Sequence, residues 1–154
     1  MRYEKIIFCS KDCTYRAPVA AEVLKKTLLE KSQLAEMLVE AKGMTVMFPE
    51  PVNGKAVAIG KSRGYDLESY IAMQITGDDL SIDNLVLVMT VADKKKLYNE
   101  YTNAINVYTI SEFVGETRDI EIPFGLSLAD YGENFKQLEN LIEKLADKLI
   151  NINK

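Results

Sequence analysis

Apolar positions along the chain follow two different periods, and the change from one period to the other marks the expected elements. Short apolar runs predict four strands, at residues 3–9, 37–41, 85–89 and 105–110. The run at 85–89 is apolar throughout, which is typical of a strand buried on both faces of a parallel sheet. The segments between the strands instead repeat their apolar residues at helical spacing.

This helical spacing predicts four helices, at residues 17–32, 52–63, 92–101 and 127–150. Pro18 falls in the first turn of the first helix, where its missing N–H does no harm, and Gly64 follows the second helix as a stop signal. The last helix has an apolar face that we expect in the core: Leu128, Tyr131, Phe135, Leu138, Leu141, Ile142, Leu145 and Leu149.

The order of these elements predicts the fold class. Strands that alternate with helices indicate an α/β fold, a three-layer sandwich with a four-stranded parallel sheet. One domain of this kind accounts for all of residues 1–154. Ligands of such folds bind beyond the carboxyl ends of the strands, so the loop from Ser10 to Arg16, after the first strand, is the expected functional site.

Charge and composition limit the chemistry of that loop. The formal net charge of -4 and the pI near 5.0 disfavour nucleic acid and anionic membrane as partners, because both require a basic surface. No apolar run is long enough for a membrane span, and we expect a cytoplasmic protein. Histidine is absent, which excludes Ser-His-Asp, Cys-His and His-based metal mechanisms. The two cysteines form no zinc pattern, so neither metal nor cofactor is expected.

Sequence motifs then add a resemblance. From Lys5 the residues KIIFCSKDCTYRAPVAAEVL resemble the opening of the low-molecular-weight protein tyrosine phosphatases, in which a strand runs into Cys, five residues, Arg, Ser, Pro and a helix. Further segments resemble family motifs in the same order: EP at 50–51, GYDL at 64–67, QIT at 74–76, MT at 89–90 and DIEIPFG at 119–125. The resemblance covers nearly the whole chain and implies the same α/β fold.

In this family a cysteine thiolate attacks phosphorus, and the resemblance implies which residues take its place here. The gapless alignment puts Ser10 at the position of the nucleophile, Ala17 at that of a supporting serine and Cys13 at that of the loop's asparagine. A serine hydroxyl needs a dedicated base, which a cysteine does not. The loop that would hold a phosphate consists of Lys11, Asp12, Cys13, Thr14, Tyr15 and Arg16.

The family's general acid is an aspartate in a later loop, and its position corresponds to Ile122, which cannot donate a proton. Glu121 is a possible substitute acid and Asp119 a more distant one, although an offset of one residue on an extended segment turns a side chain to the opposite face. Met47 and Phe124 fall at positions that form the pocket wall.

Three residues of the first loop region have competing interpretations. Arg16 at a helix start opposes the helix dipole unless an anion lies nearby, which favours an anion-binding role over that of a surface arginine. Cys9 is either a small buried residue that closes the first strand or, through a bulge of one residue, an alternative nucleophile. A reversible disulfide between Cys9 and Cys13 is a third interpretation.

Lys11 and Asp12 are expected at a solvated loop edge.

Three functions remain open at this stage. The pattern favours a phosphatase-like protein, a pseudophosphatase that binds phosphate or a phosphorylated protein or small molecule with catalysis lost or weak. The second hypothesis is an active phosphotyrosine or phosphomonoester phosphatase that uses Cys9, or Ser10 weakly, with Glu121 or water as proton donor. The third is a noncatalytic interaction scaffold. The oligomeric state and the physiological ligand are not determined by the sequence.

Overall fold

The structure is a computed structural model and describes residues 3–31, 36–121 and 127–152. Its sheet has four strands: β1 (Lys5–Ser10), β2 (Leu38–Gly43), β3 (Asn84–Val88) and β4 (Val107–Thr109). The strand order is β2-β1-β3-β4 and every pair is parallel. The four-stranded parallel sheet predicted from the sequence is therefore confirmed.

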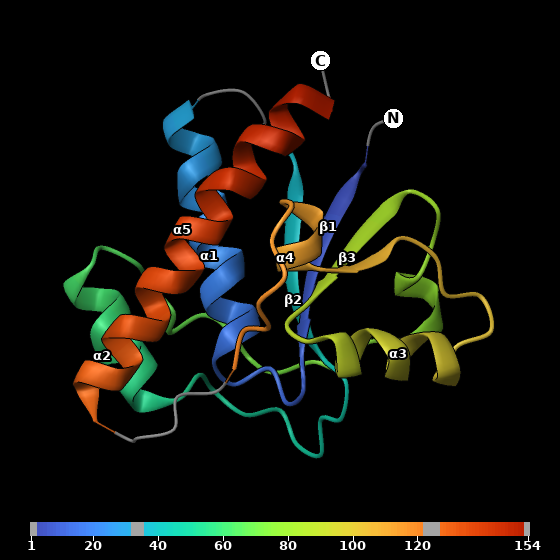
Figure 1. Cartoon of the computed structure of the whole chain (residues 1–154). Helices are drawn as coiled ribbons and strands as arrows, with labels where there is room; N and C mark the ends of the chain where they lie inside the picture. Colours follow the sequence, from blue (N-terminus) through green and yellow to red (C-terminus); the bar gives the residue numbers. More distant parts are fainter. Residues whose placement is uncertain (1–2, 32–35, 122–126, 153–154) are drawn as a thin grey trace.

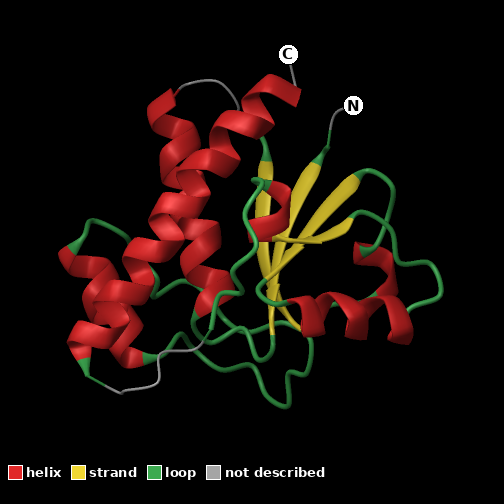
Figure 2. Cartoon of the chain, in the orientation of Figure 1, coloured by secondary structure: helices red, strands yellow, loops and turns green. Residues whose placement is uncertain are grey.

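Helices connect the strands and cover both faces of the sheet (Figures 1 and 2). They are α1 (Arg16–Lys31), α2 (Gly54–Ser62), α3 (Val91–Glu100), α4 (Ile110–Phe113) and α5 (Leu128–Ile152), with a short 3-10 helix, η1, at Gly77–Asp79. None of the helices in these described segments is long and apolar enough to cross a membrane.

Two apolar clusters separate the layers. The larger one lies between the sheet and α1, α2, α4 and α5, and it includes Phe8, Leu24 and Phe135. The smaller one lies under α3 and includes Ile7, Val86 and Leu97. Because β1 directs alternate side chains to opposite faces, Phe8 belongs to the first cluster and Ile7 to the second. The α/β three-layer arrangement expected from the alternating pattern is present.

The element bounds differ from the sequence predictions at a few ends, for local reasons. The predicted strand at 105–110 was too long, because the Thr109 hydroxyl accepts from the Glu112 amide at 3.0 Å and starts α4 at Ile110. The predicted helix at 52–63 begins at Gly54, because Asn53 caps it by accepting from the Lys55 amide at 2.9 Å. The predicted strand at 37–41 continues to Gly43 as β2, beside Ser10.

The strand order locates the expected ligand region. The chain leaves β1 towards β2 on one side and later returns to β3 and β4 on the other side, so the topology switches direction between β1 and β3. Ligands of open parallel sheets bind in the crevice at such a switch point. Here the switch point lies between the loop after β1 and the start of α3 after β3.

Candidate functional site

The loop after β1 is held in place by backbone hydrogen bonds to the segment after β2. The Ser10 carbonyl accepts from the Met44 amide at 2.9 Å, and the Lys11 carbonyl accepts from the Thr45 amide at 2.9 Å. Ser10 itself is 1% exposed, and its Oγ is buried with no hydrogen-bond partner among the described residues. Buried polar atoms are normally paired. The Ser10 hydroxyl is not, so its hydrogen-bonding capacity is unused and available to a ligand.

The centre of the loop is a tight turn. The Asp12 carboxylate accepts from the Thr14 amide at 3.1 Å and from the Thr14 hydroxyl at 2.8 Å. Cys13, between them, has a φ of 62° and is buried. This left-handed conformation is one that asparagine adopts more readily than cysteine, so the loop keeps the backbone shape that an asparagine would favour.

The loop amides remain available to an anion. Of the amides from Lys11 to Arg16, only that of Thr14 has an acceptor within the described part of the chain. The loop leads directly into α1, whose N-terminus carries a partial positive charge. Amides in a turn followed by a helix N-terminus form a common binding site for phosphate and other anions.

Arg16 is the first residue of α1 and is 6% exposed. Its Nη1 donates to the Ile120 carbonyl at 2.7 Å, which fixes the guanidinium against the segment before the family's acid position. Burial lowers the pKa of Arg16, and the charges of Asp93, Asp12 and Glu121 act in the opposite direction. A buried arginine retains its charge, so a cation lies at the base of the loop.

Tyr15 has a structural role in this arrangement. Its hydroxyl donates to Asn134 Oδ1 at 2.7 Å, and its ring packs edge-on against Tyr131 with centroids 5.0 Å apart. Asn134 in turn donates from Nδ2 to the Glu121 carbonyl at 2.9 Å. The Tyr15 side chain therefore connects the loop to α5, and only its amide is positioned to contact an anion.

Cys9 lies on the other face of the sheet. It is fully buried in the smaller apolar cluster with Ile7 and Leu97. Its strand pairs without interruption, Cys9 opposite Lys42 on β2 and opposite Val88 on β3, so β1 contains no bulge at this residue. Burial raises the pKa of the Cys9 thiol well above its ordinary value, and nearby negative charge raises it further. Both Cys9 and Cys13 are free thiols.

The remaining predicted site residues are more dispersed. Glu121 is exposed, and the Asp119 carboxylate accepts from the Val91 amide at 3.1 Å, which caps α3. Met47 is 78% exposed. Ile122 and Phe124, the predicted acid position and pocket wall, lie outside the described residues. Lys11 and Asp12 are both exposed, as expected for a loop edge.

Two residues near the loop were not identified from the sequence. Asn53 donates its amide to the Thr14 carbonyl at 2.7 Å and its Nδ2 to the Tyr131 hydroxyl at 3.2 Å, while its Oδ1 caps α2. Asn before a helix that starts with Gly54 is a capping signal, which could have revealed it. Asp93, on the first turn of α3, carries a buried Oδ2 without a partner, and its sequence neighbours give no sign of this.

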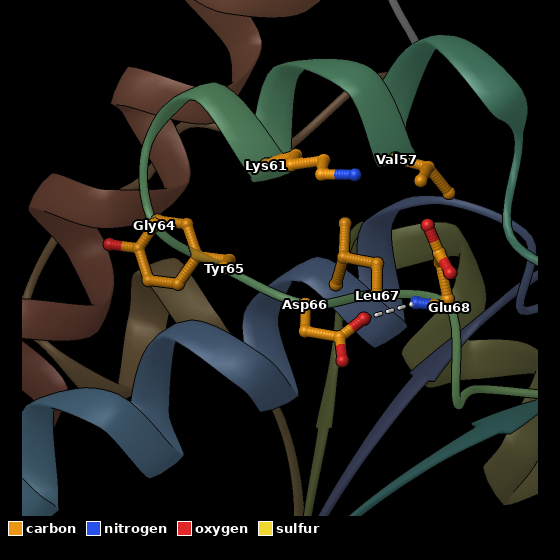
Figure 3. A pocket seen from close by; sticks show the side chains of 7 residues that line it. All are labelled: Val57, Lys61, Gly64, Tyr65, Asp66, Leu67 and Glu68. Atoms are coloured by element: carbon orange, nitrogen blue, oxygen red, sulfur yellow. Dashed lines mark hydrogen bonds between the residues drawn. The ribbon is translucent and has the colours of Figure 1, made fainter.

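Two surface pockets in the described part of the chain lie elsewhere. One lies between α2 and the segment that follows it, and Figure 3 shows its lining residues: Val57, Lys61, Gly64, Tyr65, Asp66, Leu67 and Glu68. Its polar groups are partly satisfied locally, since the Asp66 carboxylate accepts from the Glu68 amide at 3.0 Å. The other pocket lies along α3. Neither pocket includes the Ser10–Arg16 loop, and within 3–31, 36–121 and 127–152 no cluster of His, Cys, Asp or Glu could hold a metal ion.

Similar proteins have the same fold and similar length. The structure of a low-molecular-weight protein tyrosine phosphatase from T. tengcongensis superposes with a TM-score of 0.86 at 28% identity, covering 94% of this chain and 99% of that chain. A structure of YwlE arginine phosphatase superposes with a TM-score of 0.83 at 27% identity, covering 94% of this chain and 95% of that chain. The YwlE protein in this structure is a mutant in which a serine replaces the active-site cysteine, and this serine is phosphorylated.

Sequence comparison points to the same group. The low-molecular-weight protein-tyrosine-phosphatase PtpB of Staphylococcus haemolyticus is 31% identical over 141 residues, which cover 92% of this chain and 96% of that protein. The family profile of the low molecular weight phosphotyrosine protein phosphatases matches residues 5–154. The chain therefore belongs to the low-molecular-weight phosphotyrosine protein phosphatase family.

Proposed function

We propose that this family member binds phosphate or a phosphorylated ligand at the Ser10–Arg16 loop and that its catalysis is lost or weak. The observation that carries the proposal is the pair of buried groups in that loop. Arg16 is 6% exposed, and Ser10, at the nucleophile position, is 1% exposed with an unpartnered hydroxyl. The arginine and the loop amides supply positive charge and donors, while the thiol that would attack phosphorus is missing.

The chemistry of serine supports weak or absent turnover. A serine hydroxyl is a poor nucleophile without an adjacent base, and the chain has no histidine to act as one. In the YwlE mutant, a serine at the active-site position carries a phosphoryl group. A serine in this place is therefore compatible with a phosphate in the loop, whether bound or covalently attached.

A second candidate activity follows from that phosphoserine. Ser10 could accept a phosphoryl group stoichiometrically: its oxygen bonds to phosphorus, the bond from phosphorus to the leaving oxygen breaks, and the hydroxyl proton passes to the leaving group. Without the family's acid the protonation of a poor leaving group is slow, and hydrolysis of the phosphoserine is slow for lack of a base. Intact mass measurement after incubation with acetyl phosphate tests this activity. The wild type should gain the mass of one phosphoryl group, and Ser10→Ala should gain none.

Catalysis by Cys9 has less support. The side chain lies in the apolar cluster opposite the α1 face, and its raised pKa keeps the thiol protonated near neutral pH. A protonated thiol is not a nucleophile. For Cys9 to reach the loop, β1 would have to shift its register against both β2 and β3, which would turn every β1 side chain to the opposite face.

Hydrolysis of p-nitrophenyl phosphate by four proteins distinguishes these functions. We expect the wild type and Cys9→Ser to be equally slow, and Ser10→Cys with Ile122→Asp to gain turnover, since both missing groups are restored. Turnover by the wild type that disappears in Cys9→Ser would refute the proposal and assign the nucleophile to Cys9. Arg16→Lys is the control for phosphate binding in this assay. It retains a positive charge but loses the planar pair of donors, so any turnover that depends on the loop should decrease.

Direct binding distinguishes a phosphate binder from a scaffold. Calorimetric titration with inorganic phosphate should show binding to the wild type and weaker binding, by about tenfold or more, to Arg16→Lys, because the bidentate geometry is lost. A folded wild type that binds no phosphate would leave the noncatalytic scaffold as the remaining function. Thermal unfolding of each variant confirms that the comparison is made between folded proteins.

A further inference from the structure

Two side-chain atoms in the described part of the chain are buried without a hydrogen-bond partner, and they belong to the two connections that flank the switch point of the sheet. Ser10 Oγ belongs to the last residue of β1. Asp93 Oδ2 belongs to the first turn of α3, the helix that follows β3. The switch point of the sheet lies between these two connections, where ligands of open parallel sheets bind. A buried carboxylate oxygen without a donor is energetically costly, and a ligand that donates a hydrogen bond to the Asp93 oxygen would remove this cost.

Hydrogen bonds connect Asp93 to the Arg16 region. The Thr90 hydroxyl accepts from the Asp93 amide at 3.1 Å and fixes the first turn of α3. The preceding Met89 carbonyl accepts from the Ile120 amide at 2.9 Å, and the Ile120 carbonyl accepts from Arg16 at 2.7 Å. The start of α3 and the guanidinium are thus held against the same short segment, and Figure 1 shows α3 beginning beyond the end of β3 at this edge of the sheet.

The charge of Asp93 acts on this site. Burial is the largest influence on the pKa of Arg16 and lowers it, and among the charges that oppose this effect Asp93 comes before Asp12 and Glu121. The same carboxylate also raises the pKa of Cys9, the residue before Ser10. Asp93 and Arg16 are not in direct contact, because no ion pair joins them among the described residues. A ligand could therefore lie between them.

The carboxylate changes which anions the crevice can accept. The Arg16 guanidinium, the loop amides and the Ser10 hydroxyl can all donate to an anion, whereas the buried Asp93 oxygen can only accept when it is ionised. A fully ionised anion such as sulfate has only acceptor oxygens, so it would repel a carboxylate oxygen. Phosphate near neutral pH keeps at least one proton and can donate its O–H to that oxygen. Sites with a fixed hydrogen-bond acceptor discriminate strongly against analogues without the matching donor.

We propose that Asp93 determines the specificity of the phosphate site, with Oδ2 accepting a hydrogen bond from the P–O–H group of inorganic phosphate or of a singly protonated phosphomonoester and rejecting sulfate. This inference rests on the proposed function, because it requires that the Ser10–Arg16 loop binds phosphate. It adds a selection by protonation that the loop amides and Arg16 cannot provide, since they attract any anion of this size.

Calorimetric titration with phosphate and with sulfate near neutral pH tests the proposal. The wild type should bind phosphate more tightly than sulfate by about tenfold or more, as expected for a hydrogen bond to a charged group. In Asp93→Asn the ratio should approach one, chiefly through a gain in sulfate affinity, because the amide can donate to either anion. Asp93→Ala should also lose the preference, which keeps the test valid if one variant folds poorly.

Asp119→Asn is the matched control. The Asp119 carboxylate lies at the same end of α3 and accepts from the Val91 amide. The substitution therefore removes a similar charge without altering the unpartnered Asp93 oxygen. The wild-type preference for phosphate should persist. Equal affinity of the wild type for both anions, or an unchanged preference in Asp93→Asn, would overturn the role of Asp93. Failure of the folded wild type to bind either anion would instead refute the proposed function itself.

Discussion

Among single residues, the proposed function rests on Ser10, which stands where the family resemblance places a cysteine nucleophile. The loop also contains a buried Arg16 and a left-handed Cys13. The one cysteine next to Ser10 in sequence faces the opposite side of the sheet. The proposed function therefore separates phosphate binding from nucleophilic attack, because the two depend on different side chains.

Ser10→Cys should restore a thiolate. A cysteine at this position would end β1 and face the loop that leads to Arg16 and the N-terminus of α1, and a nearby arginine and helix N-terminus lower the pKa of a thiol below its free value of about 8.5. Thiolate absorbance followed against pH in the Cys9→Ala background measures that pKa. Cys9→Ala alone is the control and should show no ionisation in this range, since the pKa of the remaining Cys13 is raised to about 11 by burial. An introduced thiol that ionises only above its free value would contradict the account.

At the scale of elements, the loop depends on the close approach of β2. A Cβ on Gly43 would lie 2.4 Å from Val46 Cγ2 and 3.1 Å from the Asp12 carbonyl carbon. Gly43 also pairs with Ser10 at the end of the β1 and β2 ladder. The segment after β2 can therefore lie close enough to hydrogen-bond the loop only because Gly43 has no side chain.

Gly43→Ala should consequently destabilise the fold by about 1 to 3 kcal/mol, because overpacking forces neighbouring backbone to move. Phosphate binding should weaken as well, since Asp12 belongs to the loop. Gly54→Ala is the matched control: a Cβ there has nothing within 4 Å, and alanine favours the first turn of α2. Urea unfolding of both variants measures the difference. Equal stability of the two would show that the approach of β2 is not tight.

Sequence patterns identified the elements more reliably than their ends. The uninterrupted apolar run of β3 and the apolar face of α5 each follow from a single period, which local sequence displays fully. The prediction was wrong for Leu128, which is 53% exposed because the buried face of α5 begins only at Tyr131. The end of β4 was missed because it depends on a capping box between Thr109 and Glu112. Ser10 and Arg16 could be located through a family motif, whereas Asp93 could not, because its place beside Arg16 follows from the strand order and not from neighbouring residues.

At the scale of the whole molecule, buried thiols link stability to pH. Burial raises the pKa of Cys13 to about 11, and the charge of Asp12 acts in the same direction. Below the unfolded pKa of about 8.5 both states are protonated and the native state keeps its full stability. As the pH rises further, the unfolded chain ionises first, so stability is lost progressively up to the folded value.

The free energy of unfolding should therefore fall between pH ~8.5 and ~11 by roughly 3 kcal/mol more in the wild type than in Cys13→Ser, which has no thiol at this position. Urea unfolding at several pH values measures both profiles. Cys13→Ser is expected to differ in absolute stability as well, so the slope against pH is the relevant quantity. Parallel profiles for the two proteins would show that Cys13 does not titrate differently on folding.

The proposed function requires that phosphate binds in the Ser10–Arg16 loop without a cysteine nucleophile. A crystal structure of the wild type grown with inorganic phosphate tests it most directly. We expect a phosphate within hydrogen-bond distance of the Arg16 guanidinium and the loop amides, with Ser10 Oγ as the side-chain oxygen nearest to phosphorus and Cys9 still on the opposite face of the sheet. A well-ordered loop without an anion at high phosphate concentration, or a Cys9 sulfur turned into the loop, would contradict it.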